Sequence, residues 1–311
     1  MTKPLVHAAI KRFSSLFEER IGLSPNVLNE AAWRKIIHER MAVCGIDDYE
    51  MYFTRVTTSP IEFQELIELI VVPETWFFRD RVSIEFVSQQ LHKEWMHSGK
   101  KRSFLIMDIP CSSGEESYSI AMALLDAHLP ASHFQVEGYD ISKKLLAKAE
   151  IGSYGKNSFR GKDFSFRDKY FEKVDSEYRI HKSLTNLVKF FYGNLLDPGF
   201  PFKGKVYDVI FCRNLFIYLN REAQKIAFDF FKKLLLPKTG ILVVSPAETE
   251  LARSLGFQPL HHLRECAFVL KEKVEEKPQK QFRIEEISIE LPEKPKKERK
   301  ERDETLLKKA S

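Results

Sequence analysis

The segment with the strongest indication of the fold is Phe104-Leu-Ile-Met-Asp-Ile-Pro-Cys-Ser-Ser-Gly-Glu-Glu116. Its first six residues are almost all apolar, which is typical of a parallel strand buried on both faces. A turn ending at Gly114 follows, and residues 115–129 have the apolar spacing of a helix. Ser113 and Glu116 have the spacing of a capping box at the start of this helix. The segment therefore predicts the first strand, turn and helix of a parallel sheet.

The same alternation of strand and helix continues towards the C-terminus. Further strands are predicted at residues 134–139, 186–192, 207–212 and 240–245, with helices at 143–150 and 221–236. Residues 257–270 are expected to form two short antiparallel strands at the edge of the sheet. This order predicts a doubly wound, Rossmann-like α/β sheet with right-handed crossovers.

Composition divides the chain into three parts and one insertion. Residues 1–95 have helical periods and no strand pattern, which predicts a small all-helical N-terminal domain. Residues 96–270 are the expected α/β domain. Within it, residues 154–185 are expected to form an inserted antiparallel β-subdomain, because a structureless loop of that length is rare in a compact domain. Residues 271–311 combine dense charge with few apolar side chains, which predicts a disordered tail or linker.

The composition excludes several classes of protein. The 311 residues are 43% hydrophobic, but no apolar run approaches the roughly 20 residues that span a bilayer, so membrane insertion is not expected. The four cysteines are scattered and the N-terminus lacks an apolar signal region, which indicates a cytoplasmic protein without structural zinc or other metal. The net charge of +5 arises from nearly balanced acidic and basic residues and gives no broad field for nucleic acid.

Two acidic residues are predicted at the carboxyl ends of the first strands, where open α/β sheets bind ligands. Glu115 follows the first strand and Asp140 ends the second. The negative charges of Glu115 and Asp140 would repel a pyrophosphate, and the turn has only one glycine and no phosphate-binding GK[ST] motif to offset them. A sulfonium and a ribose diol suit this charge, which favours S-adenosylmethionine over NAD or ATP. A plain structural turn, and an Asp140 that only caps the next helix, are the alternatives.

Polar residues also follow the later strands and precede the sheet. Asn194-Leu195 is placed to flank an adenine ring, and Arg213-Asn214 emerges at the same edge with Tyr218 four residues on. Arg213 and Asn214 would alternatively only brace loops. Upstream, the run from Thr75 to Arg79 contains three aromatic residues where the helical part meets the α/β part. Such a run is either core or the wall of a cofactor cleft.

Together these motifs resemble the CheR family of chemotaxis-receptor glutamate O-methyltransferases. The resemblance rests on Thr-Trp-Phe-Phe-Arg, Cys-Ser-Ser-Gly-Glu-Glu, Gly-Tyr-Asp-Ile-Ser, Asn-Leu-Leu and Phe-Cys-Arg-Asn-Leu-Phe-Ile-Tyr, in that order. It implies a helical N-terminal domain, a methyltransferase domain with an inserted β-subdomain, and S-adenosylmethionine as cofactor. The residues it implies as cofactor contacts are Thr75, Arg79, Glu115, Asp140, Asn194, Leu195, Arg213 and Asn214.

The resemblance also implies a reaction and a partner. Arg79 and Tyr218 would lie closest to methyl transfer, and the substrate would be glutamate side chains in the cytoplasmic helical domain of a methyl-accepting chemotaxis receptor. Pro73 stands where the family usually has asparagine, which removes one contact with the cofactor. The short connection near residues 174–177 lacks the glycine-bearing loop with which some members dock on a receptor's C-terminal peptide, so we expect no such tether.

A basic cluster on the predicted helix at residues 30–41 is the candidate receptor-binding surface. It contains Arg34, Lys35 and Arg40, although such a cluster is often only a solvated helix face. The protein is expected to act as a monomer. Two other functions remain open, namely methylation of a substrate that is not a receptor and a non-catalytic signalling scaffold that binds the cofactor.

Overall fold

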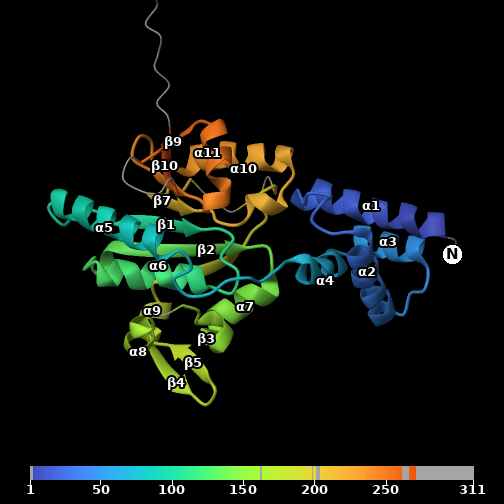
Figure 1. Ribbon diagram of the computed structural model, residues 1–311, viewed down its shortest axis with the longest axis horizontal. Coiled ribbons are helices and arrows are strands. Elements are labelled where there is room, and N and C mark those ends of the chain that lie inside the picture. The colour runs from blue at the N-terminus through green and yellow to red at the C-terminus, as the bar shows by residue number, and fades with distance from the viewer. Residues whose placement is uncertain (1–2, 162, 198, 201–203, 261–265, 271–311) are drawn as a thin grey trace, which may run out of the picture. The chain divides into compact units, whose positions relative to one another are not determined.

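The structure is a computed structural model that describes residues 3–161, 163–197, 199–200, 204–260 and 266–270. The segment 271–311, expected to be a charged tail, lies outside the described residues. The chain begins with four helices that are grouped together in Figure 1. They are α1 (Lys3–Ile21), α2 (Glu30–Cys44), α3 (Tyr49–Thr58) and α4 (Pro60–Ile70). The predicted helical N-terminal region is confirmed.

Capping residues in the sequence fix where these helices start. The Asn29 side chain accepts a hydrogen bond from the backbone N–H of Ala32 at the start of α2, and Ser59 ends α3 and caps α4. Each cap satisfies a backbone donor that a helix end leaves free. The apolar stripes of the four helices then meet in one core around Phe17 and Trp33. This core is separate from the two cores that flank the sheet.

The α/β part is built on one seven-stranded sheet with the order β6-β2-β1-β7-β8-β10-β9. Strands β6, β2, β1, β7 and β8 are parallel, whereas β10 runs antiparallel to both β8 and β9. The strands are β1 (Phe104–Asp108), β2 (Phe134–Asp140), β6 (Val188–Tyr192), β7 (Val209–Phe211), β8 (Ile241–Val243), β9 (Phe257–Pro259) and β10 (Ala267–Leu270). The predicted Rossmann-like α/β sheet and its antiparallel edge pair are confirmed.

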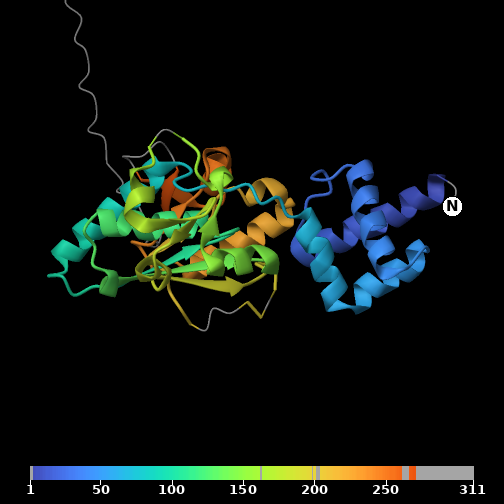
Figure 2. The same cartoon turned by 90° about the horizontal axis from the view of Figure 1, so that it is seen from below.

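Helices cover both faces of this sheet, as Figures 1 and 2 show. On one face, α5 and α6 share a core with inward side chains of the central strands, and α7 lies beside α6. On the other face, α10 and α11 pack in a second core. These helices are α5 (Arg81–His97), α6 (Glu115–Asp126), α7 (Lys143–Ile151), α10 (Arg221–Leu234) and α11 (Thr249–Ser254). The strand order reverses between β1 and β7, which places the switch point at β1.

Helix α5 packs with the sheet and not with the first four helices. Its buried residues Ile84, Val87 and Leu91 belong to the core that contains α6 and the strands. The sequence predicted that the helical domain extends to residue 95. On this packing we propose instead that the division between the two parts lies at residues 71–80.

A second, three-stranded antiparallel sheet follows α7, with the order β3-β5-β4. Its strands are β3 (Ser153–Tyr154), β4 (Phe171–Val174) and β5 (Glu177–Ile180). The antiparallel insertion is confirmed, but the sequence did not predict its short helices α8 (Ser165–Tyr170) and α9 (Lys182–Thr185). Phe159 and Phe166 pack against Phe77, which joins the insertion to the larger core. Short 3-10 turns complete the fold, η1 (Ala131–His133), η2 (Lys156–Ser158), η3 (Phe216–Tyr218) and η4 (Pro246–Glu248).

Candidate functional site

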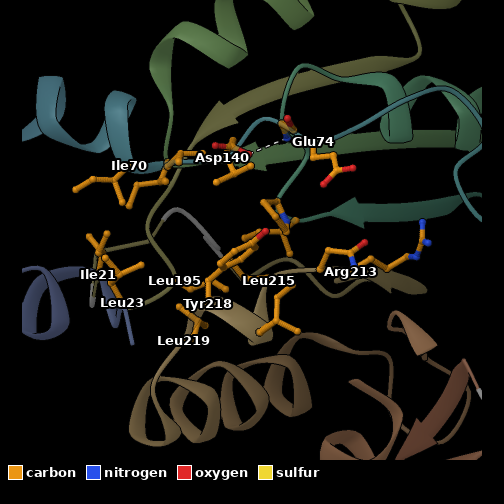
Figure 3. A pocket seen from close by; sticks show the side chains of 18 of the residues that line it. Ile21, Leu23, Ile70, Glu74, Asp140, Leu195, Arg213, Leu215, Tyr218 and Leu219 are labelled. Atoms are coloured by element: carbon orange, nitrogen blue, oxygen red, sulfur yellow. Dashed lines mark hydrogen bonds between the residues drawn. The ribbon is translucent and has the colours of Figure 1, made fainter. Parts of the chain in front are cut away.

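A cavity of about 250 Å³ lies at the carboxyl ends of β1, β2 and β7 (Figure 3). Both parts of the chain form its wall, because Ile21, Leu23 and Ile70 from the helical part line it together with residues of the α/β part. Seven of the predicted cofactor contacts line it, as does Tyr218. These are Thr75, Arg79, Asp140, Asn194, Leu195, Arg213 and Asn214.

Glu115, the eighth predicted contact, does not line this cavity. Its carboxylate accepts hydrogen bonds from the hydroxyls of Ser113 and Ser158, both at 2.7 Å, and is buried between α6 and the insertion. Glu116 lines the cavity instead. The expected capping box of Ser113 and Glu116 is wrong, because Gly114 is the N-cap and no side chain caps this helix. With its φ of 91°, Gly114 sets where the helix begins, and one residue along a helix turns a side chain by about 100°.

Asp140 presents a buried carboxylate at the end of β2. It accepts a backbone hydrogen bond from Ser112 at 2.7 Å and another from Ser142 at 2.8 Å, so both of its oxygens are oriented. Burial raises the pKa of Asp140 to about 6, although the backbone N–H groups of Ser142 and Ser112 oppose that rise. Each carboxylate oxygen can accept more than one hydrogen bond. The group is therefore held in place with acceptor capacity left for a ligand.

A buried ion pair between Glu116 and Arg213 forms another side of the cavity. Their contact is 2.9 Å, and Arg213 also donates to the backbone oxygen of Arg79 at 3.1 Å. Burial raises the pKa of Glu116 although Arg213 lowers it. Three buried polar atoms of cavity-lining residues have no partner, namely Oε1 of Glu116, Nε of Arg213 and Oγ of Ser112. Because buried polar groups are nearly always paired, these atoms fit a polar ligand.

The loop after β7 is held by a glutamate that the sequence alone did not single out as a site residue. Glu248, which is buried, accepts backbone hydrogen bonds from Asn214 at 2.9 Å and from Phe216 at 2.8 Å. Asn214 has a φ of 57°, a left-handed conformation that asparagine tolerates. The turn η3 follows at once and carries Tyr218 to the cavity. Figure 3 shows Tyr218 across the cavity from Asp140. The signal that could have identified Glu248 is its capping box with Ser245.

Arg79 belongs to a cation–π stack beside the cavity. Its guanidinium lies 4.5 Å from the ring centre of Trp76, and it donates to the backbone oxygen of Glu74 at 2.7 Å. Arg160 of the insertion lies over the same ring at 4.6 Å. The aromatic run therefore serves both predicted roles, since Phe77 is core whereas Trp76 supports the arginine that lines the cavity.

The three basic residues predicted to bind a substrate on α2 do not line the cavity. Arg34 is half-exposed and pairs with Glu30, and Lys35 is exposed. Arg40 is mostly buried and pairs with Glu62 at 2.9 Å, so it braces α2 against α4. Among the described residues, no helix is long and apolar enough to cross a bilayer, and no cluster of His, Cys, Asp or Glu is arranged to hold a metal ion.

Comparison with known proteins identifies the family. A family model described as "CheR methyltransferase, SAM binding domain" matches residues 73–259. The chain belongs to the CheR methyltransferase family. The predicted resemblance to CheR is therefore confirmed, and S-adenosylmethionine is the cofactor of this domain.

This CheR protein covers different shares of the lengths of its curated relatives. "Probable biofilm formation methyltransferase WspC" of Pseudomonas aeruginosa is 40% identical over 249 residues, which are 80% of this chain and 59% of that protein. The protein of the same name from Pseudomonas putida is 38% identical, with 84% and 62% covered. "Chemotaxis protein methyltransferase 2" of Vibrio cholerae is 29% identical, with 76% and 84% covered. The chain thus spans about three fifths of the length of the WspC relatives.

The cavity residues fit the cofactor of the CheR family. The acceptor oxygens of Asp140 suit ribose hydroxyls, and the unpaired atoms of Glu116 and Arg213 suit the amino and carboxylate groups of a methionine moiety. Apolar contacts from Leu195 and Ile141 suit a planar base.

Proposed function

We propose that this chain methylates glutamate side chains in the cytoplasmic helical domain of a methyl-accepting receptor and so tunes its signalling. The observation that carries the proposal is the cavity at the sheet edge, where Asp140, Arg213, Arg79 and Tyr218 meet. The names of the relatives, a biofilm formation methyltransferase and a chemotaxis methyltransferase, support a role in receptor signalling of this kind. We expect the protein to act in the cytoplasm as a monomer.

Each proposed contact residue suits a different chemical group of the cofactor. S-adenosylmethionine, when bound, supplies an electrophilic methyl group on a sulfonium. Asp140 would accept hydrogen bonds from the ribose, while Asn194 and Leu195 would flank the adenine. Arg213, Asn214 and Thr75 would contact the remaining polar groups. Glu116 joins this set because it lines the cavity, and Glu115 leaves it because both of its oxygens are bonded away from the cavity.

The proposed reaction needs little proton transfer. A glutamate side chain in water has a pKa of about 4.3 and is ionised at neutral pH, so it attacks without a general base. One carboxylate oxygen forms a bond to the methyl carbon as the bond from that carbon to sulfur breaks. The two charges cancel in this step, so a site with little water favours it. Arg79 and Tyr218 would orient the incoming carboxylate rather than exchange protons.

The proposed receptor surface on α2 consists of Arg34 and Lys35. Both reach solvent, whereas Arg40 is engaged with Glu62 and is left out. Cations on an exposed helix face would steer an acidic receptor helix towards the cavity, and such steering weakens as salt rises.

The direct test uses the whole chain, S-adenosylmethionine with a radiolabelled methyl group, and cytoplasmic receptor fragments from the same organism. We expect label on receptor glutamates that base releases as methanol. An Arg79→Ala variant should lose most of this labelling while it still unfolds cooperatively. Label on a protein other than the receptor would contradict the proposed substrate and identify that protein as the substrate instead. No transfer to any protein, despite cofactor binding, would instead indicate a non-catalytic scaffold.

A further inference from the structure

Helix α4 contacts the turn that carries Asp140. The carboxylate of Glu68 accepts hydrogen bonds from the hydroxyl of Ser142 and, at 2.8 Å, from the backbone N–H of Lys143. Gln64 donates to the backbone oxygen of Ile141 at 2.9 Å and to Glu68 at 2.6 Å. Two residues one turn apart on α4 thus bind three consecutive residues that follow β2.

These contacts act on the part of the turn that orients the Asp140 carboxylate. One of its oxygens accepts from Ser112, and the other accepts from the backbone N–H of Ser142. Ser142 is almost fully buried, and its hydroxyl also caps α7 through the backbone N–H of Leu145. A shift of Ser142 would therefore move the second hydrogen bond of Asp140 directly.

Apolar packing against the helical part also holds the turn at residues 141–143. Ile141 comes from the α/β part, but its side chain packs against the core of the helical part and lines the cavity. The helical part also has a second attachment that does not involve Asp140, because Ser24 donates to the backbone oxygen of Tyr218 and Asn220 donates to that of Gly22, both at 2.8 Å. Loss of the Glu68 contacts would thus leave the two parts joined.

We propose that Glu68 and Gln64 are positioning residues, which hold the turn at Ile141–Lys143 so that Asp140 faces the ribose of the cofactor. The helical part would then contribute to cofactor affinity through hydrogen bonds to this turn, in addition to the apolar wall. The proposal rests on Asp140 as the ribose acceptor and is independent of which protein is methylated.

The test measures the Kd of S-adenosylhomocysteine by calorimetry for the full chain and its variants. Glu68→Ala should raise the Kd about tenfold, since a lost hydrogen bond to a charged group costs roughly that much. Glu68→Gln keeps one acceptor oxygen and should raise it about threefold. Lys144→Gln is the matched control, because it removes the 3.0 Å ion pair between Glu65 of α4 and Lys144 of α7 without touching the turn. Its Kd should stay within about twofold.

A double-mutant cycle separates positioning from a general loss of structure. In an Asp140→Asn background, Glu68→Ala should raise the Kd by less than about threefold, because its effect passes through Asp140. A full tenfold rise in both backgrounds, or no rise in either, overturns the proposal. If Glu68→Ala does not fold, the same cycle with Glu68→Gln decides.

The outcomes also separate this proposal from the proposed function. A wild-type chain that does not bind S-adenosylhomocysteine contradicts the ribose site and with it the positioning role. Normal binding without receptor labelling contradicts only the proposed substrate.

Discussion

The helical part and the cavity each contain a buried Glu–Arg pair, and the two pairs differ in how completely they are bonded. In the helical part, both oxygens of Glu62 are occupied by Arg40, and Tyr52 and Cys44 also donate to them. At the cavity, Glu116 bonds Arg213 through one oxygen, while its other oxygen and Nε of Arg213 have no partner. The first pair is complete within the protein, and the second leaves room for a ligand.

The pKa shifts of the two glutamates run in opposite directions. Burial alone would raise the pKa of Glu62, but the hydrogen bonds from Arg40, Tyr52 and Cys44 outweigh burial and lower it. For Glu116 burial prevails over Arg213, and the pKa is raised. In this protein, the buried charge with complete hydrogen bonds stabilises the fold, and the one with incomplete hydrogen bonds lines the candidate binding site.

The largest expected effect comes from Arg213→Met. It leaves Glu116 buried without its cation, so we expect a loss of about 3–5 kcal/mol in the free energy of unfolding at neutral pH. It also removes donors from the cavity and should raise the Kd of S-adenosylhomocysteine about 100-fold. Urea unfolding and calorimetry measure the two effects. A variant with normal affinity would show that this pair belongs to the fold alone.

The matched change in the helical part is Arg40→Met. We expect a similar loss of about 3–5 kcal/mol in the free energy of unfolding, because Glu62 is left buried without its cation. The Kd of S-adenosylhomocysteine, measured where the variant is still folded, should stay within about twofold. A large loss of affinity would abolish the contrast between the two pairs.

A pH series tests Asp140, whose pKa of about 6 lies above the ordinary value of 3.8 for an aspartate. The folded state binds this proton more tightly than the unfolded state does. Ionisation of Asp140 therefore lowers the free energy of unfolding as pH rises from about 4 to 6, and above about 6 no further loss is expected. If Asp140 accepts the ribose hydroxyls as an ionised carboxylate, as we propose, the Kd should rise roughly tenfold per pH unit below about 6. The Asp140→Asn variant should have a higher Kd that changes less with pH than that of the wild type between about pH 5 and 7, and calorimetry measures both series.

The smallest expected effect comes from Arg34→Ala on the exposed face of α2. Its partner Glu30 is in solvent, so the midpoint of urea unfolding and the Kd of S-adenosylhomocysteine should not change measurably. The KM for a receptor fragment should rise roughly twofold at low salt and converge with that of the wild type at high salt. An unchanged KM at low salt would reject the proposed receptor surface.

Continuous apolar runs made the sheet predictable. The run at residues 104–109 forms β1 over Phe104–Asp108. A strand that is buried on both faces consists almost entirely of apolar residues, so such a run is easy to recognise. The sequence placed most of α5 in the helical region up to residue 95 but did not indicate which core it joins, since periodicity shows an apolar face and not the surface that covers it. The short helices α8 and α9 were missed, because four to six residues carry almost no periodic signal.

The candidate site was predictable where a residue directly follows a strand. Asp140 and Arg213 both lie at strand ends, and the topology brings them together without further information. The choice between Glu115 and Glu116 depends on the rotation of α6, which the left-handed Gly114 sets. Glu248 holds the loop at Asn214 from 34 residues away in sequence. Its capping box with Ser245 can be seen in the sequence, but the loop that it holds is known only from the folded chain.

The close approach of Gly22 to α10 links two positions that are far apart in sequence. A Cβ atom at Gly22, whose φ is 69°, would lie 2.3 Å from Cβ of Ala223, so neither position accepts a larger side chain unless the other moves. Chimeras that exchange the helical part between family members should therefore exchange the start of α10 with it. A graft that ignores this pairing would separate the two parts at the wall of the cavity that they share.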